Sequence, residues 1–147
     1  MPTDRTNVPV MNTYKGDQEV ALDANNAVTN LKYKVRTVNK TAAYTCTRAD
    51  SGTHFTQSGG PVVFTLPAVA TSAGCEYWFA SVAGVNDDLT VTAPAGTLVA
   101  FNNLGATSIA FATNGLILGG IIHVVCNGSK WMATCEVGNI LQAITVT

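Results

Sequence analysis

Four cysteines are the first residues whose chemistry could serve a site: Cys46, Cys75, Cys126 and Cys135. A structural zinc site usually contains close pairs such as Cys-x-x-Cys, but these thiols lie 29, 51 and 9 positions apart. The opening MPTDRTNVPV lacks the apolar run of a secretory signal, so we expect synthesis in a cytosol and reduced thiols. The spacing therefore favours free core thiols over a metal centre or a disulfide framework.

The two histidines, His54 and His123, are the next candidates. A hydrolytic triad needs a nucleophile, a base and an orienting acid held together. His123 lies inside an apolar run, which favours a satisfied histidine in the core or at a subunit contact. His54 lies in a stretch rich in Ser and Thr and is expected to face solvent. No nucleophile-elbow or zinc-protease motif surrounds either residue.

The acidic and glycine-rich segments also have structural interpretations. Asp50, Asp87 and Asp88 are flanked by turn-forming residues and lack the calcium-loop spacing. The run GLILGG at residues 115–120 precedes an expected strand, whereas a phosphate-binding loop precedes a helix, so we expect close backbone packing there. We therefore predict no catalytic residues, no cofactor and no metal, and a structural or binding role rather than an enzyme.

The chain is poor in charge. Charged residues make up 12% of it, about half of the usual share of roughly 25%, whereas the 47% of hydrophobic residues is ordinary for a folded protein. Few charges are left to cover a solvated surface. We expect part of the outer surface to be covered by further copies of the chain or by a partner.

The charges are also unevenly distributed. Residues 1–48 hold seven basic and four acidic side chains, and residues 49–147 hold one and five. This asymmetry is either chance or a basic N-terminal part that docks on an acidic partner. On the second interpretation the predicted contact residues are Arg5, Lys15, Lys32, Lys34 and Arg36. Without a dense basic cluster we expect no nucleic-acid binding, and the longest apolar run, of 12 residues at 115–126, is too short to cross a bilayer.

Two parts of the chain differ in pattern. Residues 1–40 are polar and are predicted to form an extended arm, with either a short helix near 18–22 or a strand near 32–38. Residues 41–147 are rich in Thr and Val and are predicted to form a β-rich body. We predict strands at 43–47, 54–57, 62–66, 76–82, 89–93, 98–101, 108–112, 121–127, 131–137 and 141–146, and one helical turn within 67–74.

The spacing of these strands predicts the fold class: an all-β, antiparallel sandwich or barrel-like (jelly-roll-like) body with an extended N-terminal arm. The local signal is strongest at Asn127-Gly128, because Asn-Gly between two apolar strands favours a tight hairpin. That hairpin should place Trp131 near Cys126 across the ladder.

Several motifs of the body resemble a β-rich module of tailed-bacteriophage virion proteins. They are Asp50-Ser51-Gly52 with Phe55, the strand end Phe64-Thr65-Leu66-Pro67, the segment from Gly74 to Phe79, and the closing Asn127-Gly128-Ser129-Lys130-Trp131. The resemblance covers residues 49–138 and includes head decoration (cement) proteins, head fibres and tail fibres. It implies a structural virion protein on the outer capsid surface, bound to the major capsid protein.

The size of the chain narrows what the resemblance implies. With 147 residues it suits a small decoration protein, commonly a homotrimer, better than the longer tail-fibre polypeptides. A tail-fibre or head-fibre receptor-binding component stays open as an alternative. A carbohydrate-binding module is another, with Tyr77, Trp78 and Trp131 as candidate sugar-stacking residues, although we expect these rings in the core. An enzyme such as a depolymerase is the remaining alternative.

Overall fold

The computed structural model describes residues 19–22, 28–32, 35–82, 88–111, 118–136 and 144–147. The chain divides into two compact units, Met1–Arg36 and Thr37–Thr147. Within the first unit, β1 (Glu19–Leu22) pairs antiparallel with β2 (Val28–Lys32), and the register shifts at Ala21/Leu22. Residues 19–22 are therefore a strand, and the alternative of a short helix there is wrong.

The second unit, called the body below, is built from strands and two short 3-10 turns. Its elements are β3 (Arg36–Lys40), β4 (Tyr44–Thr45), η1 (Arg48–Asp50), β5 (Thr53–Gln57), β6 (Val62–Thr65), η2 (Val69–Thr71), β7 (Glu76–Ser81), β8 (Leu89–Thr92), β9 (Leu98–Ala100), β10 (Asn103–Ala106), β11 (Ser108–Phe111), β12 (Ile121–Cys126), β13 (Trp131–Glu136) and β14 (Ile144–Val146). The turn η2 lies in the segment predicted to form a helical turn. The strand β10 was not predicted, since no strand was expected between the segments 98–101 and 108–112.

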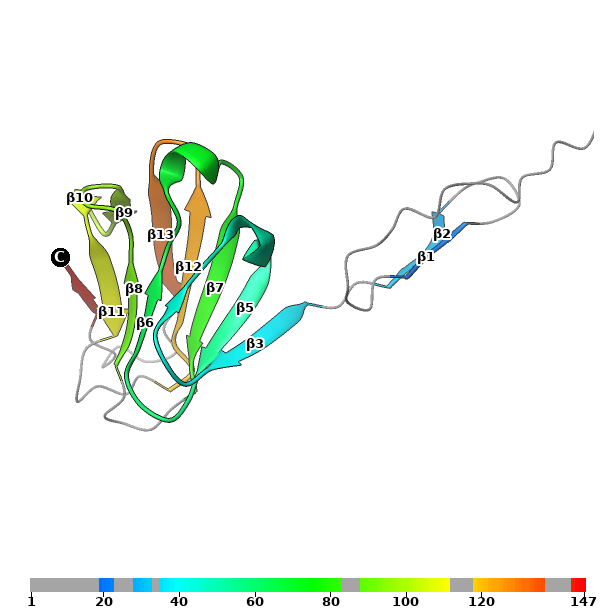
Figure 1. Cartoon of the computed structure of the whole chain (residues 1–147), viewed down its shortest axis with the longest axis horizontal. Coiled ribbons are helices and arrows are strands. Elements are labelled where there is room, and N and C mark those ends of the chain that lie inside the picture. Colours follow the sequence, from blue (N-terminus) through cyan, green and yellow to red (C-terminus); the bar gives the residue numbers. More distant parts are fainter. Residues whose placement is uncertain (1–18, 23–27, 33–34, 83–87, 112–117, 137–143) are drawn as a thin grey trace, which may run out of the picture. The chain divides into compact units, whose positions relative to one another are not determined.

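Two sheets make up the body (Figure 1). The seven-stranded sheet has the order β10-β9-β13-β12-β7-β5-β3, and the five-stranded sheet has the order β14-β11-β8-β6-β4. The prediction of an all-β sandwich is confirmed. The strand β3, which lies within the segment predicted as the arm, forms one edge of the seven-stranded sheet.

Both sheets are mixed, which differs from the purely antiparallel sandwich that we predicted. From β4 to β9 successive strands alternate between the two sheets. The chain therefore returns to each sheet in the same direction, and β4 with β6, β6 with β8, and β5 with β7 are parallel. The strand β13 also runs parallel to β9. Strand direction is set by these crossovers, and the residue pattern within a strand carries no signal for it.

The core lies between the sheets and is centred on aromatic rings. Phe55, Phe64 and Phe79 are fully buried, and the Phe64 and Phe79 ring centroids are 4.7 Å apart. Trp131 is also fully buried, and its indole Nε1 donates a hydrogen bond to the carbonyl of Pro67 at 3.1 Å. This bond joins the strand end Phe64–Pro67 to the closing hairpin, two motifs that are 64 residues apart in the chain.

The hairpin at Asn127-Gly128 forms as predicted. Cys126 pairs with Trp131 across β12 and β13, and Gly128 has a φ of 92°, which favours glycine. The side chain of Asn127 closes the turn by accepting hydrogen bonds from the backbone N–H groups of Ser129 and Lys130.

Candidate functional site

The five predicted contact residues are only partly described. Arg5, Lys15 and Lys34 lie outside the described residues. Lys32 ends β2, where it pairs with Glu19, and Arg36 begins β3 with an exposed side chain. These two residues lie in different sheets, and a shared basic contact surface stays a prediction.

The histidines lie on the outer face of the seven-stranded sheet, in one row with Trp78. His54 of β5 and His123 of β12 are both direct cross-strand partners of Trp78 on β7. The His54 and Trp78 ring centroids are 4.5 Å apart with an interplanar angle of 15°, and those of Trp78 and His123 are 4.4 Å apart at 7°. The indole is therefore held between two imidazoles, and we call these three residues the stacked row.

One carboxylate adjoins the stacked row. Glu76 Oε2 lies 3.4 Å from His123 Nε2, a distance that allows an ion pair when the imidazole is protonated. The angles do not satisfy a hydrogen bond, and Nε2 is otherwise a buried nitrogen without a hydrogen-bond partner. Glu76 is therefore an electrostatic partner of His123. Among the described residues, no serine, threonine or cysteine side chain forms a hydrogen bond with Nε2, as a nucleophile activated by this histidine would.

The stacked row corrects the prediction that Trp78 lies in the core and rules out the core alternative for His123, because both side chains are half-buried on the outer face. A subunit contact of His123 stays a prediction. His54 lies within β5 on the outer face, the side expected to face solvent, and there it packs on Trp78. Strand alternation was the available signal, because these positions have the opposite parity to the buried Phe55 and Tyr77.

The aromatic residues considered for sugar binding offer no open platform. Tyr77 and Trp131 are fully buried. Both faces of the Trp78 indole carry an imidazole, so no face of this ring is left for a sugar to stack upon. The stacking instead joins the side chains of three neighbouring strands, which stabilises the sheet.

The outer face of the five-stranded sheet carries a row of hydroxyl groups. Cross-strand pairs and hydrogen bonds place five side chains in this row, in the order Thr45, Thr65, Thr92, Ser108 and Thr147. Thr92 Oγ1 donates to Thr65 Oγ1 at 3.3 Å, and the hydroxyls of Ser108 and Thr147 are 2.7 Å apart. We call this row the hydroxyl ladder.

No charged residue lies in any of the five strands that form this sheet as described. Val63 lies on the outer face and is 40% exposed. Such a face has no group for acid–base chemistry. It can be covered by another protein surface without burying an unpaired charge.

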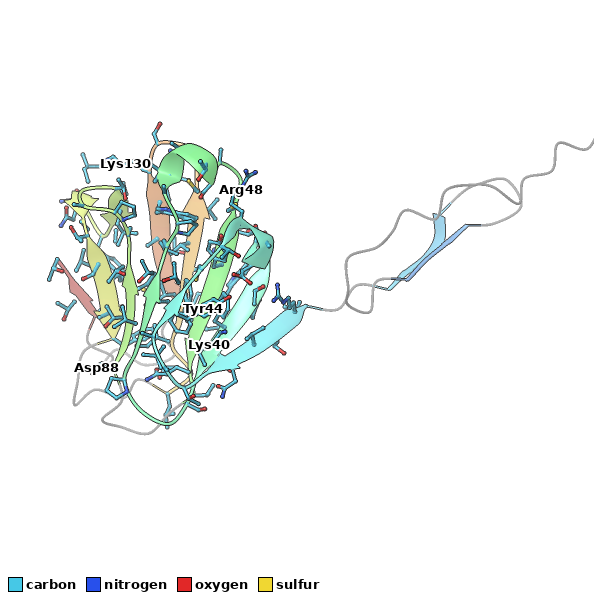
Figure 2. The ribbon with its side chains drawn as sticks, viewed as in Figure 1. Lys40, Tyr44, Arg48, Asp88 and Lys130 are labelled. Atoms are coloured by element: carbon cyan, nitrogen blue, oxygen red, sulfur yellow. The ribbon has the colours of Figure 1, made fainter. Side chains whose placement is uncertain are left out.

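The best-placed acid of the sequence has a structural role. Asp50 is buried, and its Oδ2 accepts hydrogen bonds from the Tyr44 hydroxyl at 3.0 Å and from the backbone N–H and hydroxyl of Thr47 at 2.9 and 2.7 Å. Lys40 Nζ lies over the Tyr44 ring, 3.4 Å from its centroid (Figure 2). Asp50 therefore holds the turn η1 in place. Asp87 lies outside the described residues.

The four cysteines are free thiols; Cys46, Cys75 and Cys126 are buried in the core as predicted, whereas Cys135 is half-buried and packs against it. Burial raises the pKa of Cys46 to about 12, with the Asp50 carboxylate adding to the effect, and burial raises the pKa of Cys135 to about 12. Such thiols are poor nucleophiles near neutral pH. Among the described residues no group of three His, Cys, Asp or Glu side chains could hold a metal ion.

Comparisons with known proteins identify no relative. No family model, no curated protein and no solved structure matches the chain. The structure also contains, within its described residues, no helix with the length and apolar character needed to cross a membrane. The resemblance in the sequence motifs and the surfaces above are therefore the basis for a functional proposal.

Proposed function

We propose that the chain is a structural, non-enzymatic virion protein that binds the outer surface of a bacteriophage capsid and stabilises it. Its partners are the major capsid protein and further copies of itself in a homotrimer. The protein is made in the host cytoplasm and joins the assembled head. The motif resemblance supports the setting, and the uncharged hydroxyl-ladder face is the observation that carries the proposal.

The hydroxyl-ladder face suits contact between proteins. Burial of methyl and valine groups is favourable, and hydroxyls of the ladder already form hydrogen bonds with one another, whereas a buried charge costs several kcal/mol unless it is paired. Depletion of charge is also the compositional mark of the buried centre of protein interfaces. A face formed from five uncharged strands therefore fits a surface that another chain covers.

The stabilising action follows from repetition. Each subunit bridges neighbouring capsomers, and weak contacts made by three linked bodies add up to strong attachment. The N-terminal arm can add contact by pairing with an exposed strand of the shell protein. The shell then resists the internal pressure of packaged DNA because the bridges must break before capsomers separate.

The test uses capsids produced without this protein. We expect the purified full-length chain to co-sediment with them at saturable, many-copy occupancy and to raise the temperature at which they release DNA. Electron microscopy of the same particles shows whether the bound chain is distributed over the whole head. Absence of binding to these capsids would contradict the proposal, and label confined to the tail would support the receptor-binding alternative.

A further inference from the structure

The hairpin between β9 and β10 has an unfavourable residue at its tip. Phe101 and Asn102 form a two-residue turn, with φ angles of 42° and 68°. A turn with two positive φ angles favours Asn, Asp and Gly, and a bulky side chain there is a conformational outlier. Phe101 therefore lowers the stability of the fold relative to Asn at the same position.

The side chain of Phe101 does not compensate for this cost within the chain. Four of the five phenylalanines are fully buried: Phe55, Phe64, Phe79 and Phe111. Phe101 is 59% exposed, and Leu104 on the other side of the same turn is 75% exposed. An aromatic ring that is both strained at its backbone and open to water marks a candidate contact residue.

The strands that carry the tip are held in place, and a third exposed apolar side chain lies on the neighbouring strand. Met132 is 43% exposed and pairs with Val99 on the neighbouring strand. Lys130 Nζ donates hydrogen bonds to the carbonyls of Gly96 and Leu104, which ties β10 to the hairpin of β12 and β13 (Figure 2). The ring is thus presented on a fixed support, which limits the entropy that binding would cost.

We propose that Phe101, together with Leu104, is the anchor that inserts into an apolar pocket of the capsid shell protein. This inference rests on the proposed function and assigns the residues that make its central contact. A protein pocket is favoured over a lipid surface by the charge pattern. Neither strand of this hairpin contains a basic residue, and the ammonium group of Lys130 donates to two backbone carbonyls, so the hairpin as described offers no free cation to anionic headgroups.

The substitution Phe101→Asn separates stability from binding. Because Asn suits the turn, we expect the variant to unfold at a higher temperature than the unmodified chain. Its affinity for capsids produced without this protein should fall by about 30-fold or more, the loss typical of a central aromatic anchor. Leu104→Asn should weaken binding as well, without the gain in stability.

The matched control is Val82→Asn, which changes a side chain that is 53% exposed and directly follows β7; this variant should leave capsid binding unchanged. Phe101→Asn binding as tightly as the unmodified chain would overturn the inference and leave the proposed function standing. Failure of the unmodified chain to bind capsids would overturn both. Phosphatidylcholine and phosphatidylserine vesicles are the last probe, and binding to them that depends on Phe101 would replace the protein pocket with a lipid surface.

Discussion

At the scale of single residues, side-chain environment separates structural from functional roles. Trp78 and Trp131 have the same side chain in different environments. Trp78 lies on the outer face between two imidazoles, whereas Trp131 is buried in the core and donates a hydrogen bond to the carbonyl of Pro67. Asp50 is buried with two hydroxyl donors and one backbone donor, which explains a carboxylate in a charge-poor body. The contacts of these residues all contribute to holding strands together.

The buried thiols predict a loss of stability in alkali. Burial raises the pKa of Cys46 and that of Cys135 to about 12, whereas an ordinary thiol has a pKa of 9.0. Burial also raises the pKa of Tyr77. Between these values the unfolded chain binds fewer protons than the folded chain, so the free energy of unfolding falls as pH rises. The contribution of the protonated thiols to the free energy of unfolding is fully present below about pH 9 and is lost progressively toward about pH 12.

The measurement is the urea midpoint at several pH values, with Cys46→Ala as the comparison. The variant has lost one of the contributing groups, so its midpoint should decline less steeply between about pH 9 and 11. A midpoint that stays constant over this interval in the unmodified chain would contradict the assignment of the thiols to the core.

At the scale of elements, the sequence predicted the features that depend on residues close together in the chain. The hairpin at Asn127-Gly128 was predictable because its turn residues and both strands lie within a short window. The parallel pairing of β5 with β7 could not be predicted in this way. Between these two strands the chain passes through β6 of the other sheet, and the residue pattern of β5 or β7 does not indicate this crossover. The strand β10 was not predicted, because Asn and Gly are depleted in strands and only pairing with β9 makes Asn103–Ala106 a strand.

At Gly120, which directly precedes β12, the two sheets lie too close together to leave room for a side chain. A Cβ atom at this position would lie 2.6 Å from Phe111 Cζ and 2.9 Å from its Cε1, and the Phe111 ring is fully buried. Gly120→Ala should therefore lower the free energy of unfolding by about 1–3 kcal/mol, because the ring has little room to move. Urea denaturation measures this loss.

Gly105→Ala is the matched control for that substitution. Nothing lies within 4 Å of a Cβ atom at Gly105, and its φ is not in the left-handed region. This variant should stay within about 0.5 kcal/mol of the unmodified chain. Equal stability of the two variants would show that the Phe111 ring yields freely and that the sheets are not closely packed at Gly120.

At the scale of the whole molecule, the sequence predicted the β-sandwich but not which side chains lie together on its two outer faces. Alternating Thr and Val positions were enough to predict a two-sided β body. The stacked row depends on the register of three strands, β5, β7 and β12, which bring His54, Trp78 and His123 together from distant positions. The hydroxyl ladder likewise needs five strands in the correct order, so neither surface could be found from spacing alone.

The basic N-terminal residues give a prediction about attachment. Replacing Lys32, Lys34 and Arg36 with glutamate should weaken capsid binding, most strongly at low salt, because charge contacts are screened as ionic strength rises. Thermal unfolding of the body should be unchanged, which circular dichroism can confirm. Unchanged capsid occupancy would reject these residues as contacts while leaving the Phe101 inference to its own test.

The charge-poor surface gives the prediction about assembly. If a homotrimer covers the hydroxyl-ladder face, sedimentation equilibrium should give three times the chain mass of 15.3 kDa. Val63→Lys places an ammonium group in the middle of this face and should shift the chain to a monomer, since the buried charge would have no partner there. Val82→Lys adds the same charge directly after β7, a strand of the other sheet, and should stay trimeric. A monomeric mass for the unmodified chain at all concentrations would show that this face is not covered by further copies and would leave the shell as its remaining partner.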